Sequence, residues 1–183
     1  MRGAKEANVY DKECAMRWVV DGYNVIRRAP ELAARERESL QAGREALCRL
    51  LSTAARLSGE QFTVVFDGNR GGGSLSGGLG VSVIFSNRRE TADQVLARQA
   101  RPGVAVVSND REVRQAAARA GATVVTADEF LARLARAGRP RAQEKDEDDE
   151  APAPSKKGNP RRLPKKARAA ARALRNLSRR RLW

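Results

Sequence analysis

Short apolar runs, rich in Val, Ile and Phe, alternate along most of the chain with longer stretches of helical spacing. The apolar runs are predicted to be buried strands, and they cover residues 18–20, 62–66, 81–85, 104–107 and 122–125. Apolar residues with helical periodicity lie between them, over residues 40–57, 95–99 and 113–120. Strands that alternate with helices predict an α/β fold with a central, mainly parallel sheet covered by helices.

Helix-start signals follow three of the predicted strands. A cap-forming residue stands three positions before a Glu or Gln in the pairs Thr91 and Gln94, Asn109 and Glu112, and Thr126 and Glu129. This is the spacing of a capping box, in which the two residues bond each other's backbone amides. The signals predict that helices begin at these three places.

The composition changes near residue 138 and divides the chain. An acidic run at 144–150 is followed by Ala-Pro-Ala-Pro, and this segment has too little apolar content to fold. We therefore expect an N-terminal extension, a globular domain, an acidic Pro/Ala linker and a basic C-terminal tail that is either disordered or helical. Their expected bounds are 1–16, 17–138, 139–154 and 155–183.

Charge is unevenly distributed along the 183 residues. The net charge is +14, of which residues 1–138 contribute +5, residues 139–150 contribute −3 and residues 151–183 contribute +12. A concentration of positive charge of this kind predicts a polyanionic partner.

Missing residue types exclude several chemistries. The chain has no histidine, which excludes Ser-His-Asp and Cys-His catalysis and His-ligated zinc. Cys14 and Cys48 stand far apart, which argues against a disulfide framework or a thiolate zinc site and favours a reducing cytoplasm. No apolar run approaches the roughly 20 residues that span a bilayer, so we expect a soluble protein with no membrane partner. Carboxylates around a hard divalent cation remain as the means of activating water.

Aspartates stand where such carboxylates are needed. Asp21 follows the first predicted strand, Asp67 ends the second, Asp93 opens the helix after the third and Asp110 follows the fourth. Ligands of open parallel sheets bind beyond the carboxyl ends of the strands. Each aspartate also has a local explanation, because two precede a glycine in a possible turn and two lie at helix starts. Four carboxylates at one sheet edge would repel one another unless a cation neutralised them, so we favour a site for a hard divalent cation.

Four motifs carry a resemblance to a known family. Asp-Gly-Tyr-Asn at 21–24, Val-Phe-Asp at 65–67, Glu-Thr-Ala-Asp at 90–93 and Ser-Asn-Asp at 108–110 occur in this order. In combination they are similar to the YacP-like NYN domain, which belongs to the PIN-like nucleases. The resemblance covers about residues 17–137 and implies a PIN-like three-layer α/β fold and divalent-metal-dependent endoribonuclease activity.

The resemblance also implies roles for individual residues. Asp21 becomes the central metal ligand, and Asp93 and Asp110 complete the metal-binding cluster, with one or two ions of Mg²⁺ or Mn²⁺. Asn24 orients water or a phosphate, and Asp67 is a further catalytic member. No small-molecule cofactor is implied. A non-catalytic RNA- or ribosome-binding module and a nuclease that acts on DNA stay open as alternatives.

Glycines crowd residues 68–80, where seven of 13 positions are glycine. The stretch lacks the Gly-Lys-Ser/Thr ending of a phosphate-binding loop, so a nucleotide site is not predicted. We expect a loop at the edge of the site that closes over substrate.

The tail is predicted to bind RNA. Residues 165–182 have helical spacing, with alanines and leucines on one face, and basic residues could neutralise phosphates and tether the enzyme to RNA or the ribosome. A solvated tail is the simpler alternative, and membrane-surface binding is disfavoured because the apolar face is largely alanine. The acidic run at 144–150 is a candidate to fold back on the tail when RNA is absent. The predicted RNA-binding residues are Lys156, Lys157, Arg161, Arg162, Lys165, Lys166, Arg168, Arg172, Arg175, Arg179, Arg180 and Arg181.

Overall fold

The five predicted strands form one parallel sheet. A computed structural model describes residues 16–68, 77–137 and 165–176 of the chain. Each observed strand lies within one residue of its predicted bounds: β1 (Arg17–Asp21), β2 (Gln61–Phe66), β3 (Val81–Phe85), β4 (Val104–Val107) and β5 (Thr123–Val125). The prediction of an α/β fold with a parallel sheet is therefore confirmed.

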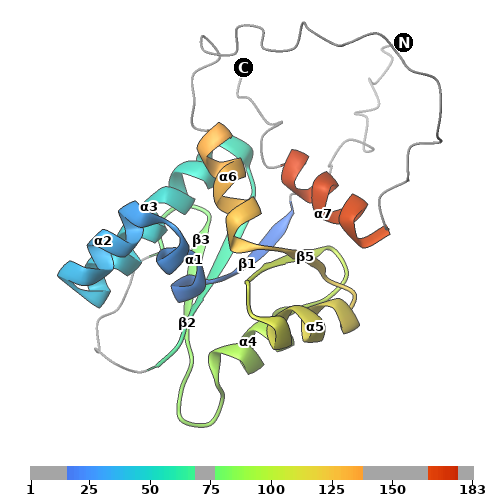
Figure 1. The fold of residues 1–183 in the computed structure, drawn as a ribbon, viewed down its shortest axis with the longest axis horizontal. Helices are drawn as coiled ribbons and strands as arrows, with labels where there is room; N and C mark the ends of the chain where they lie inside the picture. The colour runs from blue at the N-terminus through green and yellow to red at the C-terminus, as the bar shows by residue number, and fades with distance from the viewer. Residues whose placement is uncertain (1–15, 69–76, 138–164, 177–183) are drawn as a thin grey trace, which may run out of the picture.

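Strand β1 lies at the centre of the sheet, in the order β3-β2-β1-β4-β5 (Figure 1). Its register places Trp18 beside Phe62 on one side and beside Ala105 on the other. Because all neighbouring strands are parallel, the residues that end β1, β2, β3 and β4 meet at one edge of the sheet.

Helices cover both faces of the sheet (Figure 1). They are α1 (Gly22–Arg28), α2 (Pro30–Glu38), α3 (Leu40–Ser58), α4 (Ala92–Gln99), α5 (Arg111–Arg119), α6 (Ala127–Ala137) and α7 (Lys165–Asn176). The apolar pattern gave no prediction for α1 and α2, which fill the connection between β1 and α3.

Alternate residues of each strand supply two separate cores. Trp18 and Val20 of β1 face one core, which α1, α2, α3, α6 and α7 cover, whereas Val19 faces a second core under α4 and α5. This follows from the two-residue period of a strand, whose successive side chains point to opposite faces. The result is the three-layer arrangement expected from the sequence.

Two of the three predicted helix starts have the expected capping box. Thr91 begins α4 and Thr126 begins α6, each with reciprocal hydrogen bonds to Gln94 and Glu129. At the third start the N-cap of α5 is Asp110 rather than Asn109. The Asn109 side chain bonds helix α6 instead of capping α5: its oxygen accepts a hydrogen bond from Ala127 N at 2.8 Å. The correction matters because Asn109 thereby ties the start of α6 to the end of β4.

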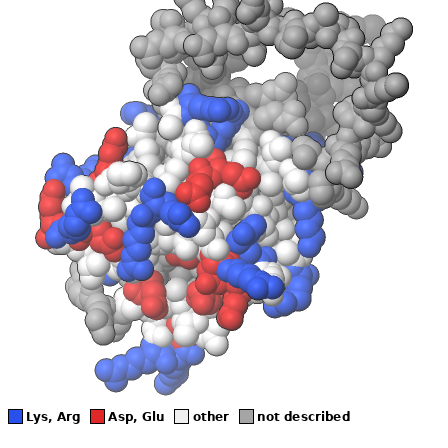
Figure 2. Space-filling model, in the orientation of Figure 1, with Lys and Arg blue, Asp and Glu red and all other residues white. Residues whose placement is uncertain are grey.

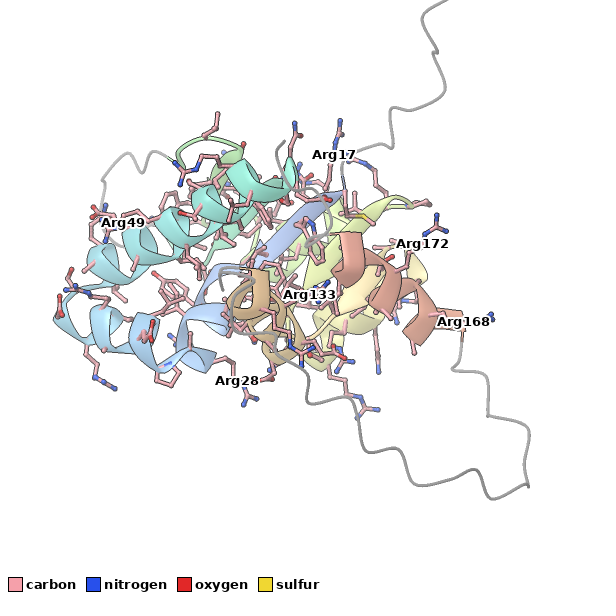
Figure 3. The ribbon with its side chains drawn as sticks, turned by 90° about the horizontal axis from the view of Figure 1, so that it is seen from above. Arg17, Arg28, Arg49, Arg133, Arg168 and Arg172 are labelled. Carbon is pink, nitrogen blue, oxygen red and sulfur yellow. The ribbon has the colours of Figure 1, made fainter. Side chains whose placement is uncertain are left out.

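Helix α7 packs on the body of the domain. Ala173 is fully buried, Ala170 and Leu174 lie against the same core, and Arg133 of α6 donates a hydrogen bond to the Leu174 carbonyl oxygen at 2.8 Å. Figure 3 shows Arg133 between the two helices, while Arg168 and Arg172 point away from the body. Burial raises the free energy of the charged guanidinium and so lowers the pKa of Arg133. Of the stretch 165–182 with helical spacing, residues 165–176 are thus helical and residues 177–182 lie outside the described residues. None of the described helices is long and apolar enough to cross a membrane.

Candidate active site at the carboxyl edge of the sheet

A cleft of about 1060 Å³ opens at the carboxyl edge of the sheet. All five predicted catalytic residues line it: Asp21, Asn24, Asp67, Asp93 and Asp110. Figure 2 shows acidic side chains gathered in the lower part of one face of the molecule, with basic side chains on either side. Motifs separated by up to 89 positions therefore meet in one place, as the parallel sheet predicted.

Asp21 is held at the end of the central strand by two hydrogen bonds. Its Oδ1 accepts from Asn24 N at 3.2 Å and caps helix α1, and its Oδ2 accepts from the Ser108 hydroxyl at 2.9 Å. An N-cap of this kind is worth about 1 kcal/mol. Asp21 therefore has a structural role as a cap, and its carboxylate is also fixed in orientation toward the cleft.

Ser108 connects Asp21 with the next motif. It is fully buried, and its oxygen accepts a hydrogen bond from Asp110 N at 3.0 Å while its hydroxyl hydrogen goes to Asp21. Asp110 in turn uses Oδ1 to accept from Glu112 N and Val113 N, at 2.7 and 3.0 Å, as the cap of α5. Its second oxygen accepts no hydrogen bond among the described residues, and Asp110 lines the cleft, so capping and a role in the site are compatible.

Asn24 lies one turn into α1 and joins the β4–α5 connection. Its Oδ1 accepts from Asn109 N at 3.1 Å, which fixes which end of the amide is oxygen. The Nδ2 group has no hydrogen-bond partner within the described part of the chain. It is a donor at the wall of the cleft, suited to a phosphate or a water molecule.

Asp67 is supported from β3. Its Oδ1 accepts from the Ser86 hydroxyl at 2.8 Å, and the same hydroxyl oxygen accepts from Gly68 N at 2.9 Å. Ser86 is buried and Asp67 is exposed, so this link ties the ends of β2 and β3 together at the surface of the cleft. Residues 69–76, which make up most of the glycine-rich loop predicted to close over the site, lie outside the described residues.

Asp93 differs from the other three aspartates because it accepts no hydrogen bond within the described residues. Thr91 is the cap of α4, so the only local benefit to Asp93 is its interaction with the helix dipole, about 0.3–1 kcal/mol. Partial burial, and then the charges of Asp110 and Asp67, raise the pKa of Asp93. Local structure thus offers this carboxylate the helix dipole but no hydrogen bond among the described residues.

Repulsion within the cluster also affects Asp21. Burial is the largest cause that raises its pKa, and the charges of Asp93 and Asp110 raise it further, against the opposing hydrogen bonds from Asn24 and Ser108. None of the ion pairs among the described residues includes any of the four aspartates. A bound cation would offset this unbalanced negative charge.

The donor set suits a hard cation that keeps part of its water shell. Among the described residues, no three acidic or cysteine side chains come close enough together to ligate one ion directly. Mg²⁺ commonly takes one or two protein carboxylates and retains several waters, and Mn²⁺ accepts the same oxygen ligands. An ion in the cleft would therefore be held by one or two of these aspartates together with its own water shell.

Sequence reasoning missed five residues that complete the site. Ser86 and Ser108 directly follow strands, a position that could have indicated them, and Arg27 and Arg28 of α1 line the cleft together with the acids. The fifth is Arg44, which is only 2% exposed. Arg44 stands three positions before Leu47 and four before Cys48, which are both buried. This spacing places it on the buried face of α3 and could have indicated it.

Arg44 stands behind the site and contacts three aromatic rings. Its guanidinium donates two hydrogen bonds to the Tyr23 hydroxyl and lies 5.5, 5.6 and 5.1 Å from the ring centres of Tyr23, Phe66 and Phe85. Each of these aromatic residues is within two positions of a cleft residue or of Ser86. Tyr23 thus packs against Arg44 and Phe66 as well as lining the cleft, and the cluster supports the ends of β2 and β3 from behind.

The unsupported charge of Asp93 leads to a prediction about stability. The folded protein holds the proton of Asp93 more tightly than the unfolded chain does, so its ionisation destabilises the fold increasingly as pH rises through the raised pKa. We expect Asp93→Asn to raise the thermal unfolding temperature modestly at pH 7.5 in EDTA, and to have little effect near pH 3. Calorimetry at both pH values measures this.

Glu31→Gln is the matched control. Glu31 occupies the second position of α2, as Asp93 does in α4, but lies outside the cleft. Its neutralisation removes a favourable dipole interaction without relieving repulsion, so we expect a small loss of stability. Equal changes in the two variants would show that Asp93 experiences no repulsion from the cluster.

The predicted RNA-binding residues of the tail are only partly described. Lys166, Arg168 and Arg172 are exposed on α7, and Lys165 and Arg175 belong to the same helix. The remaining seven lie outside the described residues: Lys156, Lys157, Arg161, Arg162, Arg179, Arg180 and Arg181.

Comparisons with known proteins agree with this geometry. No curated protein matches the chain. Two crystal structures of Rae1 (YacP) from Bacillus subtilis match it at 26% identity, one wild type and one a tryptophan-to-leucine mutant. The mutant has a TM-score of 0.57 over 66% of this chain and 76% of the other, and the wild type 0.54 over 65% and 73%. The YacP-like NYN domain family matches residues 18–176, which include α7. The chain therefore belongs to the YacP-like NYN domain family of PIN-like nucleases.

Proposed function

We propose that this protein is a divalent-metal-dependent endoribonuclease that hydrolyses RNA phosphodiester bonds in the aspartate cleft. Membership of a PIN-like nuclease family supports a hydrolase acting on RNA. The observation that carries the proposal is the convergence of four aspartates, three of them on strand ends or helix caps, in a cleft where no ion pair among the described residues neutralises them.

In this proposal, some residues of the cleft bind phosphate groups of the RNA, and others orient the attacking water molecule. Arg27 and Arg28 are exposed at the rim, and their contacts with Glu36 and Asp128, at 3.6 and 4.0 Å, are surface pairs that are worth little. Both guanidinium groups are therefore available to bind phosphates that flank the reacting one. The free amide of Asn24 donates to a phosphate oxygen or to the attacking water.

Asp21 and Asp93 provide the negative charge that directs the reaction. Asp21 is the principal ligand for Mg²⁺ or Mn²⁺, because Ser108 and the α1 backbone fix its orientation, and Asp93, Asp110 and Asp67 contribute directly or through water. When bound, the ion lowers the pKa of a coordinated water and offsets charge on the phosphate. The carboxylate of Asp93 lines the cleft and accepts no hydrogen bond among the described residues, so it would be available to accept a proton from a water molecule there.

The basic tail supplies affinity rather than chemistry in this proposal. Its contacts are with phosphates, so they tether the domain to RNA, including ribosomal RNA, without selecting the bond that is cut.

Metal removal tests the proposed activity. We expect cleavage of a circular single-stranded RNA in Mg²⁺ or Mn²⁺, complete loss in EDTA and recovery when Mn²⁺ is added in excess. A circular substrate has no ends, so its cleavage shows endonuclease activity. Gel electrophoresis of the products measures it.

A matched DNA circle separates the alternatives. Cleavage of the DNA at the same rate would identify a nuclease that does not read the 2′-hydroxyl. Binding of both circles without cleavage in any metal would identify a binding module and refute the enzymatic proposal. Cleavage that persists in EDTA would refute the role of the metal.

A further inference from the structure

A second hollow lies beside the cleft: a groove of about 880 Å³ that follows the outer edge of strand β5. Among the described residues, strand β5 pairs only with β4, so it is the edge of the sheet there. The groove is bounded by α5 on one side and by α7 on the other, and residues Thr123, Val124 and Thr126 lie along it. An edge strand presents unpaired backbone N–H and C=O groups. The groove thus offers both apolar surface and hydrogen-bonding groups.

The groove carries positive charge. Arg111 and Arg114 on one face of α5, and Lys166 on α7, line it, and all three are exposed. None of them forms an ion pair among the described residues. The single acidic residue among those lining the groove is Glu129, whose carboxylate is already engaged by the backbone N–H and hydroxyl of Thr126 at 3.0 and 2.7 Å. The net charge of the residues that line the groove is therefore positive, whereas the net charge of the residues that line the cleft is negative.

The groove and the cleft adjoin at one peptide bond. Asp110 lines the cleft, and the next residue, Arg111, lines the groove. Thr126, at the carboxyl end of β5, lies at the same edge of the sheet as the aspartates. From there the groove follows β5 toward Gly121. A polymer whose reacting phosphate lies among the aspartates can thus continue directly along the three cations.

We propose that this groove binds the segment of a single RNA strand next to the scissile phosphate. The proposal rests on the proposed function, since it takes RNA as the substrate. Phosphates contact Arg111, Arg114 and Lys166, while bases lie over the small apolar side chains between them, such as Ala118 and Ala170. An extended peptide could also pair with an edge strand, but three unpaired cations beside a phosphodiesterase cleft favour a polyanion.

Helix α7 forms one wall of the groove. The helix docks through Ala173, Ala170 and Leu174, and this places Lys166 across the groove from Arg111 and Arg114. One wall of the groove therefore comes from the C-terminal part of the chain, some 50 residues beyond the other wall.

The test compares two triple variants of equal charge. Arg111, Arg114 and Lys166 are replaced by Ala in one, and Arg56, Arg101 and Arg119 in the other. The second set is exposed, lies outside the groove and the cleft, and includes Arg119 of the same helix α5. Binding of a 12-nucleotide single-stranded RNA is measured by fluorescence anisotropy in EDTA, between 50 and 300 mM KCl, so that the RNA stays intact.

We expect the groove variant to lose at least about 10-fold in affinity at the lowest salt, and the slope of log affinity against log salt to fall by about 2, because each phosphate contact on a single strand contributes about 0.7. The control variant should change affinity less than about 3-fold. An equal loss of RNA affinity in both variants, or no loss in either, would contradict the proposal that the groove binds RNA. A wild-type chain that binds no RNA overturns it as well. If the wild-type protein binds RNA through the groove but cleaves none in Mn²⁺, the proposed function is refuted, and the proposal that the groove binds RNA is retained.

Discussion

Replacement of Asp21 by Asn should abolish RNA cleavage while leaving the fold and RNA binding intact. Asn can replace Asp as an N-cap, so the hydrogen bond from Asn24 N at 3.2 Å is retained. The Ser108 hydroxyl can turn to accept from the new amide. The fold therefore loses little, but the site loses the charge of its best-oriented ligand.

We expect kcat to fall at least about 100-fold, since loss of a group that merely supports a metal ligand costs about 10- to 100-fold. Initial rates on a single-stranded RNA in Mn²⁺ measure this effect. Anisotropy in EDTA should give the same affinity for both proteins.

Glu31→Gln serves as the control for the loss of one negative charge outside the cleft. It should keep the wild-type rate. If the Asp21→Asn variant cleaves RNA at a rate close to wild type, Asp21 is not the principal ligand of the proposed mechanism. If neither wild type nor variant cut RNA and both bound it equally, the chain would be a binding module.

Replacement of Gly22 by Ala should destabilise the protein, although alanine normally favours a helix. Gly22 begins α1 and is buried, and a Cβ added there would lie 2.3 Å from Phe66 Cε1 and 2.5 Å from Cδ1. The ring cannot yield easily, because Tyr23 contacts it edge-on, Phe85 stacks on it and the Arg44 guanidinium lies 5.6 Å from its centre. Overpacking of this kind costs about 1–3 kcal/mol, against a gain of at most about 1 kcal/mol from helix propensity.

Urea denaturation should therefore show a lower free energy of unfolding for Gly22→Ala, and the rate of cleavage by the folded protein should also fall, because the displaced backbone carries Asp21. Phe66→Leu in the same background tests the cause. The smaller side chain makes room for the added methyl group, so the double variant should lose less than the sum of the single variants. An unchanged or higher stability of Gly22→Ala would show that the ring moves freely.

The role of Gly22 illustrates what local patterns leave undecided. An Asp-Gly pair suggested turn chemistry, which relies on the backbone freedom of glycine. In the structure Gly22 is helical and lacks the positive φ of the glycines that need this freedom, such as Gly59 at the end of α3. Its requirement is space beside Phe66, a residue 44 positions away in the chain.

The sequence by itself determined the strands, the main helices and the four acidic residues that line the cleft. Strand bounds were predictable because buried parallel strands require continuous apolar runs, and the aspartates were predictable because parallel strands bring their carboxyl ends to one edge. The family motifs added Asn24. The capping boxes at Thr91 and Thr126 were also legible, since a cap involves residues only three positions apart.

Only the tertiary structure decided the strand order, the support behind the acids and the position of α7. Ser108 bonds Asp21 across 87 positions, and Arg44 bonds Tyr23 across 21, and neither pairing has a local signal. The basic groove likewise needs α5 and α7 on either side of β5, which apolar spacing does not specify. Periodicity reports which face of an element is buried, whereas the partner that buries it is selected by packing and hydrogen bonding throughout the fold.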